Sequence, residues 1–406
     1  MDLGIEEILT LLGRFLVSNS PLTDLVFKNM GVTDDVSKGI GIKKMIQVKG
    51  EGNTEAESKE THVNLILNKS TNKVSFVEVG EEFVNVIFSF LTLPLGSLIK
   101  LQTKKSFLEC VDNLYQSAEN LSLDNFKSEE CKNILISPKL APFFGYTGSM
   151  LEMDEIAPRE SSCRGCYVCC WRNDNTGCSV SECAHGVKQA YFRLLNPKSP
   201  EGSTEIGGGY AKGKFLVTTD LCVSQLSASS SIQIIKNQDI SLSDLVMKRA
   251  TFGEIQALDL LRSAVTSKTP IDDVLNTHQK VARGNRRSNT WALHKLPSQS
   301  KRKVIQNHNL DLSVTYFTME KVTVNFLVGK VKQRVVLVEA DSNFVDILFS
   351  LCDFPLGTIV RLLNKQSYSG CLDKLYESIE NLNVQNFQAK ACKIMLLFPQ
   401  SAAADG

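Results

Sequence analysis

Residues 73–101 read KVSFVEVGEEFVNVIFSFLTLPLGSLIKL, and residues 334–362 read RVVLVEADSNFVDILFSLCDFPLGTIVRL. A constant 261 positions separate the two stretches, and their similarity runs without a gap over 74–132, with 25 identities in those 59 positions. Agreement of this length is far beyond chance, so the sequence predicts an internal repeat, which we call module B. A shorter similarity, segment A, pairs residues 4–26 with residues 253–275 at an offset of 249.

Each module B is predicted to begin with a β-hairpin. Two β-rich runs flank a polar turn at residues 63–68 and 73–79, and the pattern returns at residues 324–328 and 334–340. Short runs of alternating, β-branched character on either side of a turn are typical of a hairpin.

Two helices are predicted to follow the hairpin. Residues 83–91 are apolar on nearly all sides, with Asn85 and Ser89 as a thin polar stripe, which is typical of a mostly buried helix. The Pro-Leu-Gly corner ends this helix because proline cannot continue the hydrogen-bond ladder. Residues 111–121 then place their apolar side chains on one helical face.

The segment between the two B modules has its own pattern. Residues 214–226 are predicted to form a strand, and the serine-rich run that follows offers an N-cap to a short helix. Residues 254–266 of segment A are predicted to form another helix.

These elements predict an α+β fold made of tandem repeated small α+β modules, each a hairpin plus two helices, with an inserted cysteine-rich, zinc-ribbon-like segment. The expected parts are a partial unit with the A helix (1–31), a polar linker (32–61), the first B module (62–146), the cysteine-rich segment with its glycine-rich connector (147–213), a strand and helix segment that ends in an A helix (214–276), a basic linker (277–311) and the second B module (312–400). Residues 5–17 are expected to pack against the second B module or to dock poorly.

Residues 161–185 read SSCRGCYVCCWRNDNTGCSVSECAH and hold six of the twelve cysteines. Two close pairs supply the four tetrahedral ligands that structural zinc requires, and four protein ligands leave no position for a catalytic water. The predicted ligands are Cys163, Cys166, Cys178 and Cys183. Cys169, Cys170 and His185 remain alternative ligands, and unliganded cysteines or a redox role remain alternative readings of the cluster. Outside this cluster, Cys110, Cys131, Cys371 and Cys392 are predicted to be small buried hydrophobic residues rather than a second metal site.

Composition narrows the class of protein. The formal net charge is +1, so no whole-molecule field attracts nucleic acid or an anionic membrane. The N-terminus carries acids where a secretory signal needs positive charge, and the longest uncharged run, residues 83–99, is short and broken by Pro94 and Gly96. We therefore expect no membrane span and an intracellular location, cytoplasmic or nuclear.

The phrases KVSFVEVGEEFVNVIFSFLTLPLGSLIKL, NLYQSAENL, LVTTDLCVSQLSASSSI and LLRSAVTSKTPIDDV resemble a plant family catalogued as domain of unknown function 674. The resemblance implies units strung together, often with a cysteine-pair segment in the middle of a unit. It implies no activity, substrate or catalytic residue. The chain departs from the family pattern by starting and ending within a unit, which leaves open a truncated gene product, and by the wider spacing of its second cysteine pair.

No P-loop, HExxH or GxSxG motif is present. The leading expectation is a non-enzymatic binding or scaffold protein with one structural zinc and a protein partner. The alternative is a nucleic-acid-binding protein that uses the cysteine-rich segment and the basic linker, through Arg283, Arg286, Arg287, Lys301, Arg302 and Lys303. The second alternative is an enzyme of unrecognised type, with its site between units.

Overall fold

The computed structural model describes residues 1–29, 59–101, 108–146, 148–157, 196–199, 208–276, 321–329, 331, 333–366 and 370–402. These residues form a fold of mixed helix and sheet, in agreement with the predicted α+β class. None of the helices in these ranges combines the length and the apolar character that crossing a membrane requires.

The larger sheet is antiparallel, with the strand order β5-β4-β3-β2-β6. Its strands are β2 (Thr61–Asn68), β3 (Lys73–Val79), β4 (Phe215–Thr218), β5 (Val223–Gln225) and β6 (Leu245–Phe252). The predicted first hairpin is confirmed as β2 and β3. The prediction of one strand over residues 214–226 is wrong, because Leu221 adopts a φ of 63° and turns the chain between β4 and β5. The sequence pattern did not predict β6.

The remaining strands are β1 (Asp2–Leu3), β7 (Val322–Thr323), β8 (Asn325–Gly329) and β9 (Arg334–Glu339), with β1 paired to β7 and β8 paired to β9. The helices are α1 (Ile5–Phe15), α2 (Pro21–Asn29), α3 (Glu81–Ser89), α4 (Ser97–Leu101), α5 (Glu109–Asn120), α6 (Glu129–Ile136), α7 (Ala228–Asn237), α8 (Glu254–Thr266), α10 (Ser342–Asp353), α11 (Leu356–Leu362), α12 (Leu372–Asn381) and α13 (Lys390–Leu397). Short 3-10 turns lie at η1 (Phe90–Thr92), η2 (Leu123–Asn125), η3 (Leu242–Asp244) and η5 (Val384–Asn386), and η4 (Asp272–Asn276) is a π-helical turn. Helices α3 and α8 confirm two predicted helices, and Ser227 caps α7 as predicted by accepting a hydrogen bond from the Ser230 amide.

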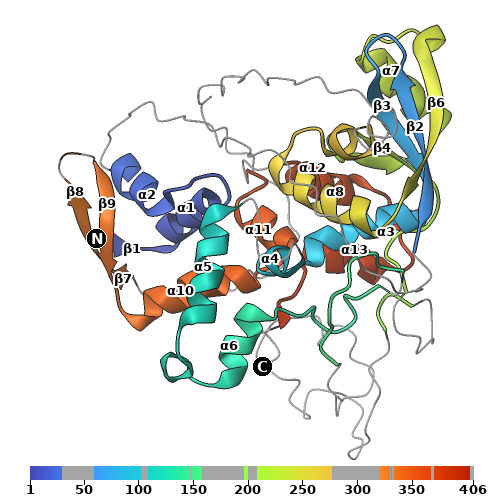
Figure 1. Ribbon diagram of the computed structural model, residues 1–406. Helices are drawn as coiled ribbons and strands as arrows, with labels where there is room; N and C mark the ends of the chain where they lie inside the picture. Colours follow the sequence, from blue (N-terminus) through green and yellow to red (C-terminus); the bar gives the residue numbers. More distant parts are fainter. Residues whose placement is uncertain are drawn as a thin grey trace, which may run out of the picture.

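The two hairpins lie at opposite ends of the molecule. In Figure 1 the five-stranded sheet occupies one end, β8 and β9 occupy the other, and most of the helices lie between them. One apolar cluster runs through these helices and includes buried residues of both B modules, such as Phe83 and Phe344. Burial of apolar surface therefore joins the two modules in one core.

The hairpins β2–β3 and β8–β9 have the same register. Ile66 pairs with Phe76 in the first, and Leu327 pairs with Leu337 in the second, each 261 positions further along the chain. A β-bulge follows that pair in both hairpins. Sequence similarity and strand geometry therefore agree residue by residue in these two hairpins.

The two Pro-Leu-Gly corners meet each other. The Leu95 amide donates to the Phe354 carbonyl and the Leu356 amide donates to the Leu93 carbonyl, both at 2.9 Å, with an antiparallel bridge between Pro94 and Pro355. Donors Leu95 and Leu356 are 261 positions apart, and so are acceptors Leu93 and Phe354. The contact is therefore reciprocal, as in a twofold arrangement.

Glycine is favoured at these corners because the two backbones approach closely. A Cβ atom on Gly96 would lie 3.2 Å from the Cys352 carbonyl oxygen, and one on Gly357 would lie 3.0 Å from that of Leu91. A side chain at either position would press against the other module's backbone.

Each segment A contacts both B modules. In the first segment A, the Thr23 hydroxyl accepts from the Val335 amide in β9, and the Ser18 carbonyl accepts from the Cys110 thiol in α5. In the second, the Asp272 carboxylate accepts from the Val74 amide in β3. The Ser267 carbonyl of that segment accepts from the thiol of Cys371, next to α12.

Helix α1, which lies within residues 5–17, contacts the second B module. A Cβ atom on Gly13 of α1 would lie 3.5 Å from a methyl carbon of Leu363, and the Met1 ammonium donates to the Val324 carbonyl at 2.8 Å. The additional contact between Ser18 and Cys110 shows that the segment bridges the two modules, which the sequence did not predict.

Candidate functional site

The residues singled out for metal binding lie outside the described part of the chain. This applies to the predicted zinc ligands Cys163, Cys166, Cys178 and Cys183, to the alternatives Cys169, Cys170 and His185, and to all six basic-linker residues from Arg283 to Lys303. Within the ranges that the structure describes, no group of three or more His, Cys, Asp or Glu side chains is arranged to hold a metal ion.

The chain on either side of the cysteine cluster meets at Gly145. The Gly145 amide donates to the Glu155 carboxylate at 2.7 Å, and the Lys198 ammonium donates to the Gly145 carbonyl. Glu155 also accepts from the Phe143 amide at 2.5 Å. Residues 155 and 198 lie on opposite sides of the cysteines in sequence, and both are bonded to the backbone of Gly145.

A buried amide organises the neighbouring segment. The Asn85 side-chain oxygen accepts from the amides of Tyr210 and Ala211, both at 2.7 Å, and the Tyr210 hydroxyl donates to the Phe144 carbonyl at 2.6 Å. Asn85 is 3% exposed and Tyr210 is fully buried. The polar stripe predicted on the helix at residues 83–91 thus anchors a distant loop to α3.

Lys198 is a buried lysine with an unusual environment. Its side chain is almost wholly buried, and its ammonium lies 4.7 Å from the centre of the Tyr210 ring. Burial lowers the pKa of Lys198 to about 8, although the nearby Glu155 carboxylate acts in the opposite direction. Burial raises the pKa of Tyr210 well above its ordinary value, so this phenol stays protonated and donates its hydrogen bond.

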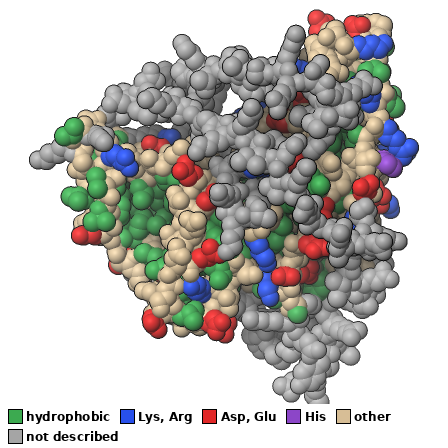
Figure 2. All heavy atoms as spheres, viewed as in Figure 1, with side chains coloured by type: hydrophobic (Ala, Val, Ile, Leu, Met, Phe, Trp, Pro, Cys, Tyr) green, Lys and Arg blue, Asp and Glu red, His purple; other side chains and the backbone are tan. Residues whose placement is uncertain are grey.

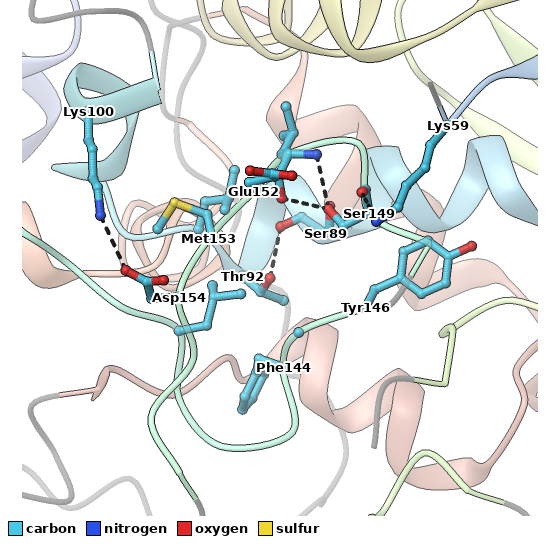
Figure 3. Close-up of a pocket in the computed structure, with 14 residues that line it drawn as sticks. Lys59, Ser89, Thr92, Lys100, Phe144, Tyr146, Ser149, Glu152, Met153 and Asp154 are labelled. Atoms are coloured by element: carbon cyan, nitrogen blue, oxygen red, sulfur yellow. Dashed lines mark hydrogen bonds and ion pairs between the residues drawn. The ribbon is translucent and has the colours of Figure 1, made fainter. Parts of the chain in front are cut away.

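A cavity of about 410 Å³ opens beside this network (Figure 3). Its lining residues are Lys59, Ser89, Thr92, Leu93, Lys100, Leu140, Phe144, Gly145, Tyr146, Ser149, Leu151, Glu152, Met153 and Asp154. Figure 3 shows Ser89 and Thr92 near its centre, with Lys100 and Asp154 to one side and Lys59 to the other.

Five of the charged or hydroxyl side chains in the lining, those of Lys59, Ser89, Thr92, Lys100 and Asp154, take part in interactions within the protein. Lys100 lies 3.5 Å from the Asp154 carboxylate, and Lys59 donates to the Ser149 carbonyl at 3.3 Å. The Ser89 and Thr92 hydroxyls donate to helix carbonyls at 2.7 and 2.8 Å. Among the described lining residues there is no histidine and no cysteine, so these residues offer neither an imidazole base nor a thiol nucleophile.

Four of the described cysteines are buried. Cys110, Cys371 and Cys392 are buried as predicted, and Cys352 is buried as well. Burial raises the pKa of Cys110 to about 11 and that of Cys352 and Cys371 to about 12, so these thiols are protonated at neutral pH and react poorly.

The predicted burial of Cys131 is wrong, since this side chain is exposed. Cys131 lies on α6, which buries none of its residues, whereas the related Cys392 lies on α13 beneath the loop that carries Tyr210. The Gln388 amide fixes that loop by donating to the Tyr210 carbonyl at 2.9 Å.

Sequence reasoning missed Lys198, Glu155 and Tyr210 as a group. The sequence indicates this group only indirectly. Asn85 is a polar residue on an otherwise apolar helix, and a buried polar side chain requires a hydrogen-bond partner.

The described residues form a mixed helix and sheet fold, in which Asn85, Glu155 and Lys198 bond to the backbone of other chain segments. The chain belongs to the family described as Protein of unknown function (DUF674), whose model matches residues 1–255 and 318–405. The family expected from the sequence is thereby confirmed. Searches of curated proteins and of solved structures found no match to the chain.

Proposed function

We propose that the protein is a non-enzymatic binding or scaffold protein, built from two copies of an α+β module with one structural zinc. One observation carries the proposal: Asn85, Glu155 and Lys198, the buried polar groups of the candidate site, each bind backbone amides or carbonyls of another segment. Such bonds hold segments in place, because a buried polar group must be satisfied, and they leave those atoms occupied.

Contacts that recur at the spacing of 261 support the repeated module. Tyr115 donates to the Ile136 carbonyl as Tyr376 donates to that of Leu397. Lys132 donates to the carbonyls of Glu119 and Leu121, and Lys393 does the same to those of Glu380 and Leu382. The same hydrogen bonds are expected in two stretches of similar sequence if a folding module was duplicated.

For the metal we propose Zn²⁺ held by Cys163, Cys166, Cys178 and Cys183. The pairing of close cysteines in a reduced protein favours a tetrahedral thiolate site. The hydrogen bonds that hold Glu155 and Lys198 to Gly145 also support this proposal, because they bring the described residues on either side of the cysteine cluster close together.

Elemental analysis of the purified chain tests the metal. We expect about one zinc per chain, and its loss in a variant with Cys163→Ser and Cys166→Ser. Cys222→Ser is the matched control because Cys222 is exposed and lies outside the cluster, so its zinc content should equal that of the unmodified protein. A zinc content near zero in the unmodified protein would overturn the metal proposal.

The alternative function is nucleic-acid binding. Its support is the charge of residues 274–310, which contain eight Lys or Arg and no acid. Replacing Arg283, Arg286 and Arg287 by alanine should then abolish salt-dependent retention on a nucleic-acid column. A control variant with alanine at Lys127, Lys236 and Arg249, which are exposed elsewhere, should be retained like the unmodified protein. Absence of retention at low salt favours the scaffold function.

The second alternative is an enzyme of unrecognised type, for which the cavity in Figure 3 is the candidate site. Its paired Lys100 and Asp154 and its internally bonded hydroxyls argue against it.

A further inference from the structure

The two hairpins share one register but have different surroundings. In the five-stranded sheet, β4 pairs with the outer edge of β3, and β6 pairs with the whole length of β2. Within the described chain, β8 and β9 form a sheet of two strands only. The segment that completes the first hairpin, residues 214–252, has no described equivalent beside the second.

The outer faces of the hairpins differ accordingly in exposure. Ile66 and Phe76 are 6% and 2% exposed, and they form a small apolar cluster with Leu216 of β4, covered by Ile234 and Ile235 of α7. The related Leu327 and Leu337 are 60% and 51% exposed, and Val336 is 65% exposed. Figure 2 shows hydrophobic side chains gathered over the end of the molecule where β8 and β9 lie.

The same segment covers a second surface on its other side. The Val223 amide of β5 donates to the Ser378 hydroxyl of α12 at 2.8 Å, and the Lys212 amide donates to the Asn386 carbonyl. Helix α13 buries Cys392, Met395 and Leu396, whereas its relative α6 buries none of its residues. Residues 208–252 thus bridge the first hairpin and the helices α12 and α13.

An equivalent bridge is open between the second hairpin and the helices α5 and α6. Helix α10 contacts both α5 and α6, and β9 contacts α2, so these elements lie on one side of the molecule (Figure 1). We name β8, β9, α5 and α6 the second docking surface. Exposed apolar residues such as Leu337, beside strand edges that pair with no further strand in the described chain, are typical of an interaction site.

We propose that the second docking surface binds a strand–strand–helix segment of the same chemistry as residues 208–252, supplied by another protein of this family. This inference rests on the proposed function, because it treats the two B modules as copies. The occupant is not a second copy of this chain, since the described part of each chain has two hairpins and one such segment, which its own β3 already binds. Binding would add a strand to β9 and lay an apolar helix face on Leu327 and Leu337.

The first hairpin predicts the register of the complex. Phe76 pairs with Thr218, Val77 with Val217 and Glu78 with Leu216 in the antiparallel sense. The incoming strand should therefore place its Phe-Leu-Val-Thr sequence against residues 337–340, with its leucine opposite Glu339. Its helix should then present two adjacent isoleucines to Leu337, as Ile234 and Ile235 are presented to Phe76.

The test uses the full chain and a fluorescent synthetic peptide with the sequence of residues 208–238. We expect saturable binding, observed as a rise in fluorescence anisotropy, and at least a tenfold weaker affinity for the Leu337→Lys variant. Because Leu337 is half exposed, this variant should fold and unfold like the unmodified protein. Leu242→Lys is the control, since Leu242 is 72% exposed on another part of the surface, and it should bind like the unmodified protein.

Three results would overturn the inference: no binding, equal binding by Leu337→Lys, or a homodimer of the unmodified chain that Leu337→Lys dissociates. The last result would make a second copy the occupant. Zinc content is measured on the same samples and should not change with Leu337→Lys, so failure of this inference is distinguishable from failure of the metal proposal.

Discussion

At the scale of single residues, the interior is organised by a few buried polar side chains. Asn85 satisfies two backbone amides of a segment that is 125 positions away in sequence. Its relative in the second module, Asp346, is exposed, because no loop covers α10 at that point in the described chain. The same position of the repeated helix is therefore a buried, hydrogen-bonded residue in the first module and a solvent-exposed residue in the second.

Asn85→Ala should destabilise the protein by about 2–4 kcal/mol, because the amides of Tyr210 and Ala211 would remain buried without an acceptor. Urea unfolding measures this change. Asp346→Ala, at the related position, should change the free energy of unfolding by less than about 0.5 kcal/mol. Equal losses in the two variants would contradict the role assigned to Asn85.

Lys198 gives stability a distinct dependence on pH. Its folded-state pKa is lowered from 10.5 to about 8, chiefly by burial, so the unfolded chain binds more protons between those values. The contribution of Lys198 to the free energy of unfolding therefore rises with pH across that window. Relative to Lys198→Met, the unmodified protein should gain on the order of 2–3 kcal/mol between pH 8 and 10.5.

Urea unfolding of both proteins at several pH values measures this difference. The buried cysteines act in the opposite direction, since burial raises their pKa, but they are present in both proteins and largely cancel. A difference that does not change with pH would show that Lys198 titrates normally.

At the scale of elements, the Pro-Leu-Gly corners connect sequence to architecture. Each corner ends one helix, begins the next and exchanges a backbone hydrogen bond with the other corner. The close approach explains why glycine follows Pro-Leu in both modules, at Gly96 and Gly357.

Gly357→Ala should destabilise the protein by about 1–3 kcal/mol, because its Cβ would lie 3.0 Å from the Leu91 oxygen and 3.1 Å from Pro399. Gly208→Ala is the matched control, since its Cβ would make only ordinary contacts at 3.9 and 4.0 Å. Thermal unfolding compares the two variants, and a stable Gly357→Ala protein would argue against the tight corner.

Elements with strong local patterns could be predicted from the sequence. Helix α8 has the predicted bounds, and the β2–β3 hairpin follows from its alternating runs around a polar turn. Strand β6 could not be predicted because its apolar and polar residues do not alternate cleanly, with Met247 exposed and Val246 and Lys248 both partly buried. The turn at Leu221 was missed because a leucine with positive φ has no sequence signature.

At the scale of the whole molecule, the two modules are interlocked. Each segment A binds the hairpin of one module and contacts the second helical part of the other, and the corners bind each other. Local periodicity cannot predict such contacts, since they join residues more than 90 positions apart and each bond uses at least one backbone atom, which every sequence has. The repeat identified two similar modules in the sequence but not the way they combine.

The central claim is that both modules fold as one unit. Hydrogen exchange, followed by mass spectrometry at increasing urea concentrations, tests it most directly on residues 81–101 and 342–362. We predict that both stretches lose protection at the same urea concentration and with the same free energy of opening, because reciprocal bonds link Leu95 and Leu356 to the opposite module. Loss of protection in one stretch while the other stays protected would contradict the interlocked arrangement.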